Sequence, residues 1–120
     1  MGYQGADGRY RDTDDVTLQA SVTKTATFTG AWVEVRARGA LRALLTVSAA
    51  SGTNPTADVI IETARDSAGT GLRTIATFTQ ATDVTTEWKS ATGCDRFARA
   101  KATVGGTNPS FTYSVAGDAV

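Results

Sequence analysis

The segment ARAKATVGGTNPSFTYSV, residues 98–115, contains two alternating runs of apolar and polar residues on either side of the tetrapeptide GTNP. Small apolar residues occupy every second position before the tetrapeptide, and large apolar residues do so after it: Ala98, Ala100, Ala102 and Val104, then Phe111, Tyr113 and Val115. A period of two is typical of a β-strand with one buried face. The segment therefore predicts two strands that meet at GTNP.

The same tetrapeptide occurs a second time, at residues 52–55, again between alternating runs. Proline fixes its own φ and biases the preceding residue, here Asn54 or Asn108, toward an extended backbone. Glycine supplies a sharp bend. We therefore predict that each copy forms a hairpin connection of one type, and a ligand-binding loop is the alternative interpretation.

Similar alternation recurs along most of the chain, in runs that begin near Val16, Val33, Leu41, Ala57 and Leu72. We expect the apolar faces of the first and third of these runs to include Ala20 and Ala49. Residues 81–95, which include Trp88, read as a longer and less regular connection. About seven or eight short strands separated by Gly, Asn, Asp and Ser predict an all-β fold, a single antiparallel β-sandwich. The β-sandwich domain is expected over residues 16–120, after a polar, extended N-terminal arm over residues 1–15.

Composition argues against several classes of function. The chain has 120 residues, 12 basic and 12 acidic, and so no formal net charge, whereas binding to nucleic acid or to a membrane surface favours a basic excess. It contains no histidine and one cysteine, Cys94, which leaves no Ser-His-Asp triad and no intrachain disulfide. We expect a protein that is not an enzyme, with no cofactor and no bound metal, and with neither nucleic acid nor membrane as a partner.

The N-terminal segment MGYQGADGRYRDTDD has no apolar stretch of the kind found in signal peptides, so we expect synthesis in the cytoplasm without a secretion signal. The segment is either a disordered leader or an arm that becomes ordered on a partner. Tyr, Trp and Arg are preferred contact residues at protein interfaces. The candidate partner contacts are therefore Tyr3, Arg9, Tyr10, Arg11 and Trp88.

The two tryptophans, Trp32 and Trp88, have two interpretations. A tryptophan in a small β domain usually packs in the core or at an interface. The alternative is a platform on which a sugar ring stacks.

Two long stretches contain the two GTNP segments: LLTVSAASGTNPTADVIIETARDSAGTGLRTIATFTQATD, residues 44–83, and RFARAKATVGGTNPSFTYSVAG, residues 96–117. Together they resemble a family of small virion proteins of tailed bacteriophages. The resemblance covers about two-thirds of the chain, and it rests on the two GT-x-P segments, ATFTQ and ATVGG in that order. Residues 1–39 do not match the family, and no catalytic residue carries over.

The resemblance implies a structural β-sandwich of the particle, namely a capsid decoration (cement) protein. Such a protein binds the outer face of the assembled head, so the implied partner is the major capsid protein and the implied location is the capsid surface of the virion. A homo-oligomer is expected, a trimer or else a dimer. The alternatives are a tail- or fibre-associated module that binds carbohydrate, and a head–tail or tail-tube component.

Overall fold

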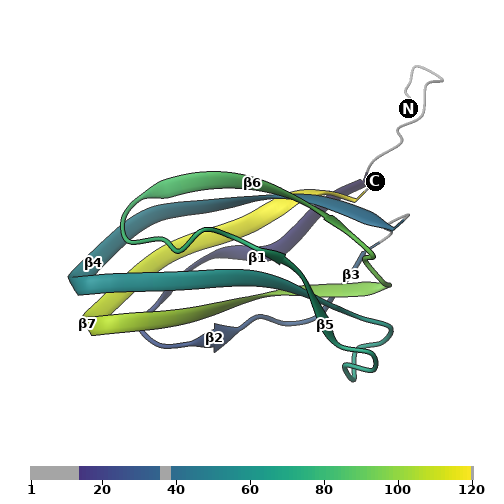
Figure 1. Cartoon of the computed structure of the whole chain (residues 1–120), viewed down its shortest axis with the longest axis horizontal. Helices are drawn as coiled ribbons and strands as arrows, with labels where there is room; N and C mark the ends of the chain where they lie inside the picture. The colour runs from purple at the N-terminus through teal and green to yellow at the C-terminus, as the bar shows by residue number, and fades with distance from the viewer. Residues whose placement is uncertain (1–13, 36–38, 120) are drawn as a thin grey trace, which may run out of the picture.

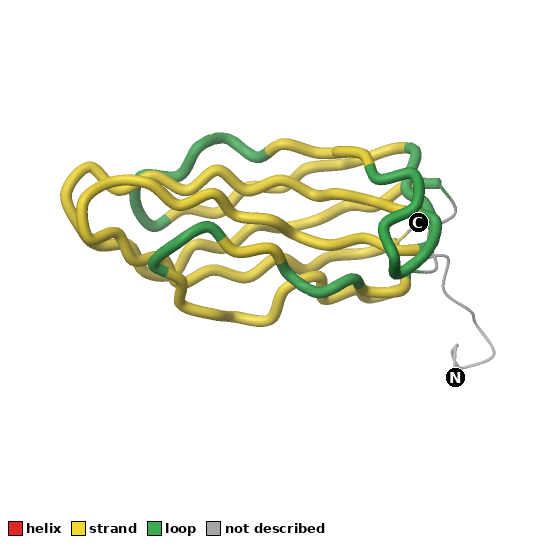
Figure 2. Tube along the Cα trace, turned by 90° about the horizontal axis from the view of Figure 1, so that it is seen from below, coloured by secondary structure: helices red, strands yellow, loops and turns green. Residues whose placement is uncertain are grey.

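The computed structural model of the protein describes residues 14–35 and 39–119, which contain β-strands and loops and no helix (Figures 1 and 2). The predicted all-β, antiparallel fold is therefore confirmed. Most of the predicted arm, residues 1–13, lies outside the described residues. The strands are β1 (Asp14–Lys24), β2 (Phe28–Thr29), β3 (Val33–Glu34), β4 (Ala40–Ala64), β5 (Arg73–Thr77), β6 (Thr85–Thr92) and β7 (Phe97–Ala119).

The seven strands belong to one antiparallel sheet whose centre is the pair of long strands β4 and β7. On one side of this pair, β5 and β6 hydrogen-bond to β4. On the other side, β1, β2 and β3 hydrogen-bond to β7. The sheet is thus a ribbon four strands wide, in which shorter strands follow one another along each outer edge.

This ribbon is folded in half. The first part of β4 pairs with β6 and with the last part of β7, while the second part of β4 pairs with β5 and with the first part of β7. Figure 1 shows both long strands running to the same end of the molecule and turning back there. We call the two halves the β6 layer, which includes β1, and the β5 layer, which includes β2 and β3. The shortest dimension of the molecule, 19 Å, accommodates two sheets about 10 Å apart.

The two GTNP segments lie where the ribbon folds, and the prediction of two hairpin connections is wrong. In a hairpin, the residues flanking a turn would pair with each other. Here they pair with the flanks of the other copy, through Ser51 with Ser110 and Thr53 with Thr107. Asn54 and Asn108 both have a φ of 48°, in the left-handed region, instead of the extended backbone we expected. Both central strands must bend at one place, so the same bend occurs in each.

The alternating apolar residues lie between the layers, as predicted. In the β5 layer the buried face of β7 carries only alanine, at Ala98, Ala100 and Ala102. Bulky side chains come from the β6 layer, among them Phe111 and Tyr113, and also from β4 in the β5 layer, where Val59 and Ile61 are buried. The small side chains of β7 in the β5 layer leave room for these large ones, which gives a close-packed core. Among the described residues, the largest fully buried side chains are Tyr113, Phe111, Leu41, Leu45, Ile61, Val47, Val59, Val115 and Thr63.

The alternation breaks where the strand register shifts. Ala20 and Ala49 were expected to follow the apolar faces of their runs, but both are exposed. A register shift lies between Gln19 and Val22, and another lies between Val47 and Ala49. A bulge inserts an extra residue into one strand, so the side chains beyond it change face.

Residues 81–95 are not an irregular connection, because they contain β6. This strand pairs with β4 in an unbroken register from Ala40 opposite Thr92 to Val47 opposite Thr85. Only Ala91 of β6 is fully buried, so the strand lacks the apolar alternation on which our prediction depended. It is positioned by its backbone pairing with β4 instead.

Candidate interaction surface

Of the predicted contact residues, Tyr3, Arg9, Tyr10 and Arg11 lie outside the described residues, and Trp88 lies on β6. Because side chains alternate along a strand, the buried Ala91 shows that the odd-numbered residues of β6 face the other layer. Trp88 therefore points outward, and the residue is 54% exposed. The structure thus places this tryptophan on the surface of the chain and not in its core.

Trp88 lies at the edge of a set of side chains that crosses three strands. Leu44 on β4 is directly opposite Trp88, and Ala116 on β7 is opposite Leu44. The guanidinium carbon of Arg42 lies 5.1 Å from the centroid of the Trp88 ring. The same guanidinium donates a 3.0 Å hydrogen bond to the Asp118 carboxylate. We call this surface, made of Arg42, Leu44, Trp88, Ala116 and Asp118, the Trp88 face.

The contacts within the Trp88 face restrict the indole without burying it. A cation–π contact at an exposed site contributes about 0.5–1 kcal/mol. The Arg42–Asp118 pair is exposed, with 57% and 22% of the side chains accessible, and pairs of this kind contribute at most about 1 kcal/mol to folding. An aromatic side chain held by neighbours loses little entropy on binding. The face is therefore suited to contact another macromolecule through one aromatic anchor with a charged rim.

Trp32 has a different role. Its ring lies 4.2 Å from the guanidinium carbon of Arg99 on β7, and Arg99 donates a 2.8 Å hydrogen bond to Glu62 on β4. The side chains of Arg99 and Glu62 are only 21% and 11% exposed. The half-buried Trp32 therefore covers an ion pair on the outer face of the β5 layer, and it does not belong to the core between the layers.

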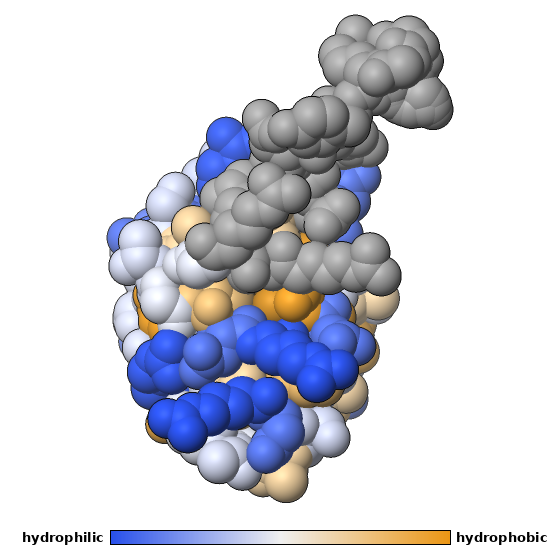
Figure 3. Space-filling view, turned by 90° about the vertical axis from the view of Figure 1, so that its right-hand side faces the viewer, coloured by the Kyte–Doolittle hydropathy of each residue, from blue (hydrophilic) through white to orange (hydrophobic). Residues whose placement is uncertain are grey.

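The end of the molecule opposite the GTNP segments carries exposed ion pairs. Figure 3 views this end and shows bands of hydrophilic side chains on it. Arg73 bonds to Asp95 at 2.7 Å, and Arg96 bonds to Glu34 at 2.7 Å. These exposed pairs lie where β3, β5 and β7 begin or end, and we assign them to the solvated surface.

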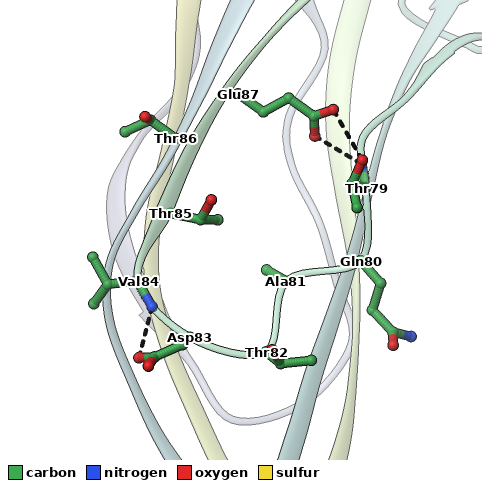
Figure 4. A pocket seen from close by; sticks show the side chains of 9 residues that line it. All are labelled: Thr79, Gln80, Ala81, Thr82, Asp83, Val84, Thr85, Thr86 and Glu87. Atoms are coloured by element: carbon green, nitrogen blue, oxygen red, sulfur yellow. Dashed lines mark hydrogen bonds between the residues drawn. The ribbon is translucent and has the colours of Figure 1, made fainter.

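The loop from β5 to β6 encloses an open pocket of about 470 Å³, lined by residues 79–87. The Glu87 carboxylate accepts hydrogen bonds from the Thr79 amide at 2.7 Å and from the Thr79 hydroxyl at 3.0 Å. Asp83 accepts a hydrogen bond from the amide of Val84. Figure 4 shows these bonds at the two ends of the loop. Both carboxylates thus support the shape of the loop itself.

Cys94 is a buried residue of the connection before β7. It is 7% exposed, the Thr63 hydroxyl contacts its sulfur at 3.8 Å, and its thiol donates to the Asp95 carbonyl. Burial raises the pKa of the Cys94 thiol above its ordinary value of 9.0. The thiol is therefore protonated at neutral pH, and a protonated thiol is a poor nucleophile and metal ligand.

Within residues 14–35 and 39–119, no group of three or more His, Cys, Asp or Glu side chains is arranged to hold a metal ion. The same residues include no helix with the length and hydropathy of a membrane span.

No protein-family model, no curated protein and no solved structure matches this chain.

Proposed function

We propose that this protein is a virion component of a tailed bacteriophage, a decoration protein that binds the outer face of the assembled head and stabilises it. Two observations support the proposal: the resemblance of residues 44–83 and 96–117 to small virion proteins, and the all-β body in which those residues lie. The implied partner is the major capsid protein.

The observation that carries the proposal is the exposure of Trp88 on a regular strand of the sheet. Interfaces depend on a few aromatic and arginine anchors surrounded by contacts that contribute little. Trp88 and Arg42 are residues of these two types, and Asp118 and the hydroxyls of Thr86 and Ser90 provide polar groups around them. A contact with another protein explains why this tryptophan is exposed at the surface of the sheet.

A modest contact is sufficient for this function. A shell presents many equivalent sites, and an oligomeric decorator that engages several of them gains avidity through effective concentration. Binding to the assembled shell, and not to its free subunits, stabilises the shell by mass action. We therefore expect the protein to raise the temperature at which heads break open.

The test is to add purified protein to undecorated heads and to image them by electron microscopy. We expect regular density at symmetric positions on the shell, and Trp88→Ala is expected to weaken binding by about 10- to 100-fold, as for an interface anchor. Leu72→Ala is the matched control, because Leu72 is 48% exposed but lies in the turn before β5. Absence of symmetric density on shells would refute decoration, and density on tails would favour a tail component instead.

The candidate contacts before β1 are tested separately, by deleting residues 1–13. This deletion leaves β1 complete and removes Tyr3, Arg9, Tyr10 and Arg11. We expect weaker attachment to heads with an unchanged unfolding temperature. Unchanged attachment would refute a role for these four residues.

A second candidate is binding of host carbohydrate by a tail- or fibre-associated module. It is favoured by the same exposed indole, next to the hydroxyls of Thr86 and Ser90. A glycan array with wild-type protein and with Trp88→Ala tests it. Binding that is lost with Trp88→Ala would support this candidate, and an array without binding would reject it.

A further inference from the structure

The strand β6 has one edge without a partner strand. It hydrogen-bonds to β4 and to no other strand in the part of the chain that the structure describes, and Figure 1 shows it at the margin of the molecule. It is eight residues long and pairs with β4 without a register shift. An edge of this kind can pair with a strand from another chain.

The other outer strands of the described sheet carry features that disfavour such pairing. β1 contains two register shifts and β5 lies beside one, at Ile61 and Glu62 of β4. β2 and β3 are only two residues long. Bulges and short edge strands are common protections against edge-to-edge association. β6 is therefore the strand of the described sheet whose edge is both long and regular.

The sequence of β6, TTEWKSAT, is complementary to itself in the antiparallel direction. Glu87 and Lys89 lie on either side of Trp88 and share the face that points toward the other layer. Their charged groups are 3.8 Å apart, with 25% and 41% of the side chains exposed. The two opposite charges are thus one position before and one position after a central aromatic residue.

We propose that two copies of this protein associate edge to edge through β6, about a two-fold axis that passes beside Trp88. In this register Glu87 lies opposite the partner's Lys89, Lys89 lies opposite the partner's Glu87, and the two Trp88 side chains are neighbours. Opposite charges and aromatic pairs at directly opposed positions stabilise antiparallel strands. The β6 layers of the two chains then form one continuous sheet.

The charges select this register over its neighbours. In an antiparallel pair, residues directly opposite each other have their side chains on the same face of the sheet. The two-fold axis must therefore pass beside one residue of each strand, and the next possible register moves the axis to the neighbouring residue. An axis beside Glu87 places the two Glu87 carboxylates opposite each other. An axis beside Lys89 places the two Lys89 ammonium groups opposite each other. Like charges directly opposed are destabilising, so the axis beside Trp88 is preferred.

Antiparallel pairing of a strand with its own copy closes after two chains, because the interface is isologous. Of the two oligomers expected from the sequence resemblance, the dimer therefore fits this edge and the trimer does not. Pairing through the edge leaves the outer face of both sheets open, so the two Trp88 faces stay available to a further partner. This inference does not depend on the proposed function.

The test is sedimentation equilibrium at protein concentrations up to about 1 mM, since two paired edge strands bury a small area and form a weak dimer. We expect a reversible monomer–dimer equilibrium. In the proposed dimer, residue 87 of each chain lies opposite residue 89 of the other. Glu87→Lys makes both of these pairs Lys–Lys and Lys89→Glu makes both of them Glu–Glu, so each variant is expected to weaken the dimer at least 10-fold. A 1:1 mixture of the two variants restores opposite charges at both positions and is expected to dimerise like the wild type.

Lys101→Glu is the matched control, because Lys101 is a partly exposed lysine of β7 in the β5 layer, and its charge reversal is expected to leave dimerisation unchanged. Circular dichroism checks that each variant is folded, because Glu87→Lys also removes the hydrogen bonds to Thr79. Lys89→Glu keeps those bonds and must lose dimerisation as well. The proposal is overturned if the wild-type protein is a monomer at all concentrations or forms a trimer. It is also overturned if neither charge reversal weakens dimerisation, or if the mixture of the two folded variants stays monomeric.

Discussion

Gly52 faces the backbone of Asn108 so closely that a Cβ atom on the glycine would lie 2.7 Å from the Asn108 carbonyl oxygen. The relationship is reciprocal, because a Cβ on Gly106 would lie 2.7 Å from the carbonyl oxygen of Asn54. The two glycines have nearly the same φ, 113° and 110°. The two GTNP segments are therefore related by a local two-fold arrangement in which each glycine packs against the Asn-Pro backbone of the other.

Replacing either glycine with alanine is expected to destabilise the fold strongly and by a similar amount. Gly52→Ala and Gly106→Ala each combine an unfavourable φ with a clash against backbone atoms that cannot move independently. These two effects cost about 1–3 kcal/mol each, so we expect the free energy of unfolding to fall by about 2–6 kcal/mol. Urea denaturation measures the change.

Gly39→Ala separates the two effects. Gly39 also has a positive φ, 96°, but a Cβ there would meet no atom of the described residues within 4 Å. Its replacement should therefore show the conformational cost alone, about 1–3 kcal/mol. If Gly52→Ala costs no more than Gly39→Ala, the close approach of the two segments does not contribute to stability.

The alternating runs allowed most of the fold to be predicted from the sequence. Where an apolar residue recurs at every second position, as at Ala57, Val59 and Ile61, the burial of one face follows from the geometry of a strand. The prediction needed only local information. It failed at Ala20 and Ala49, since a bulge depends on the register with a neighbouring strand and leaves no local signal.

The role of GTNP could not be predicted, because its decisive contacts are non-local. A glycine, an asparagine and a proline between two strands fit a hairpin equally well on local grounds. The pairing of Thr53 with Thr107 joins residues far apart in the chain, and it makes the two copies a joint bend. The repetition of the motif is the sequence signal that could have suggested this, since two adjacent strands that bend at one place need the same backbone conformation.

Trp88 was selected from the sequence as a contact residue, and the structure places it at the surface. The strand that carries it was missed because an edge strand with polar residues on both faces has no hydrophobic period. Arg42 and Asp118, which complete the Trp88 face, could not be assigned to it without knowing that β4 lies between β6 and β7.

The ion pair between Glu62 and Arg99 is expected to matter for stability far more than the exposed pair between Glu34 and Arg96. The first pair is largely buried beside Trp32, whereas the side chains of the second are 54% and 67% exposed. Glu62→Gln leaves the guanidinium of Arg99 without its counter-charge in a poorly solvated site. We expect a loss of about 2–3 kcal/mol, against less than about 0.5 kcal/mol for the matched change Glu34→Gln.

Arg99→Lys tests whether the geometry of the guanidinium contributes beyond its charge. Lysine retains the charge but not the planar group that stacks on the Trp32 ring and bonds to Glu62. We expect a loss of about 1 kcal/mol by urea denaturation, together with a change in the fluorescence of Trp32. Equal stability of Arg99→Lys and wild type would show that charge alone is sufficient.

The Tyr113 hydroxyl is buried and has no hydrogen-bond partner among the residues that the structure describes, and its ionisation is expected to lower stability at alkaline pH. Burial raises the pKa of Tyr113 above its ordinary value of 10.0. Below that value the tyrosine is neutral in both the folded and the unfolded state. As the pH rises above it, the unfolded chain loses the proton first, so the free energy of unfolding falls by up to about 1.4 kcal/mol per pH unit until the folded tyrosine also ionises.

Tyr113→Phe removes both the unpaired hydroxyl and this titration while keeping the ring in the core. Because an unsatisfied buried hydroxyl costs about 1–3 kcal/mol, we expect the variant to be as stable as the wild type or up to about 1 kcal/mol more stable near pH 8. Above pH 10 the difference in the free energy of unfolding between Tyr113→Phe and wild type should increase, as measured by urea denaturation at a series of pH values. Cys94 is present in both proteins, so its own raised pKa cancels in the comparison. A loss of 2 kcal/mol or more at about pH 8 would show instead that the hydroxyl has a buried partner, such as a bound water.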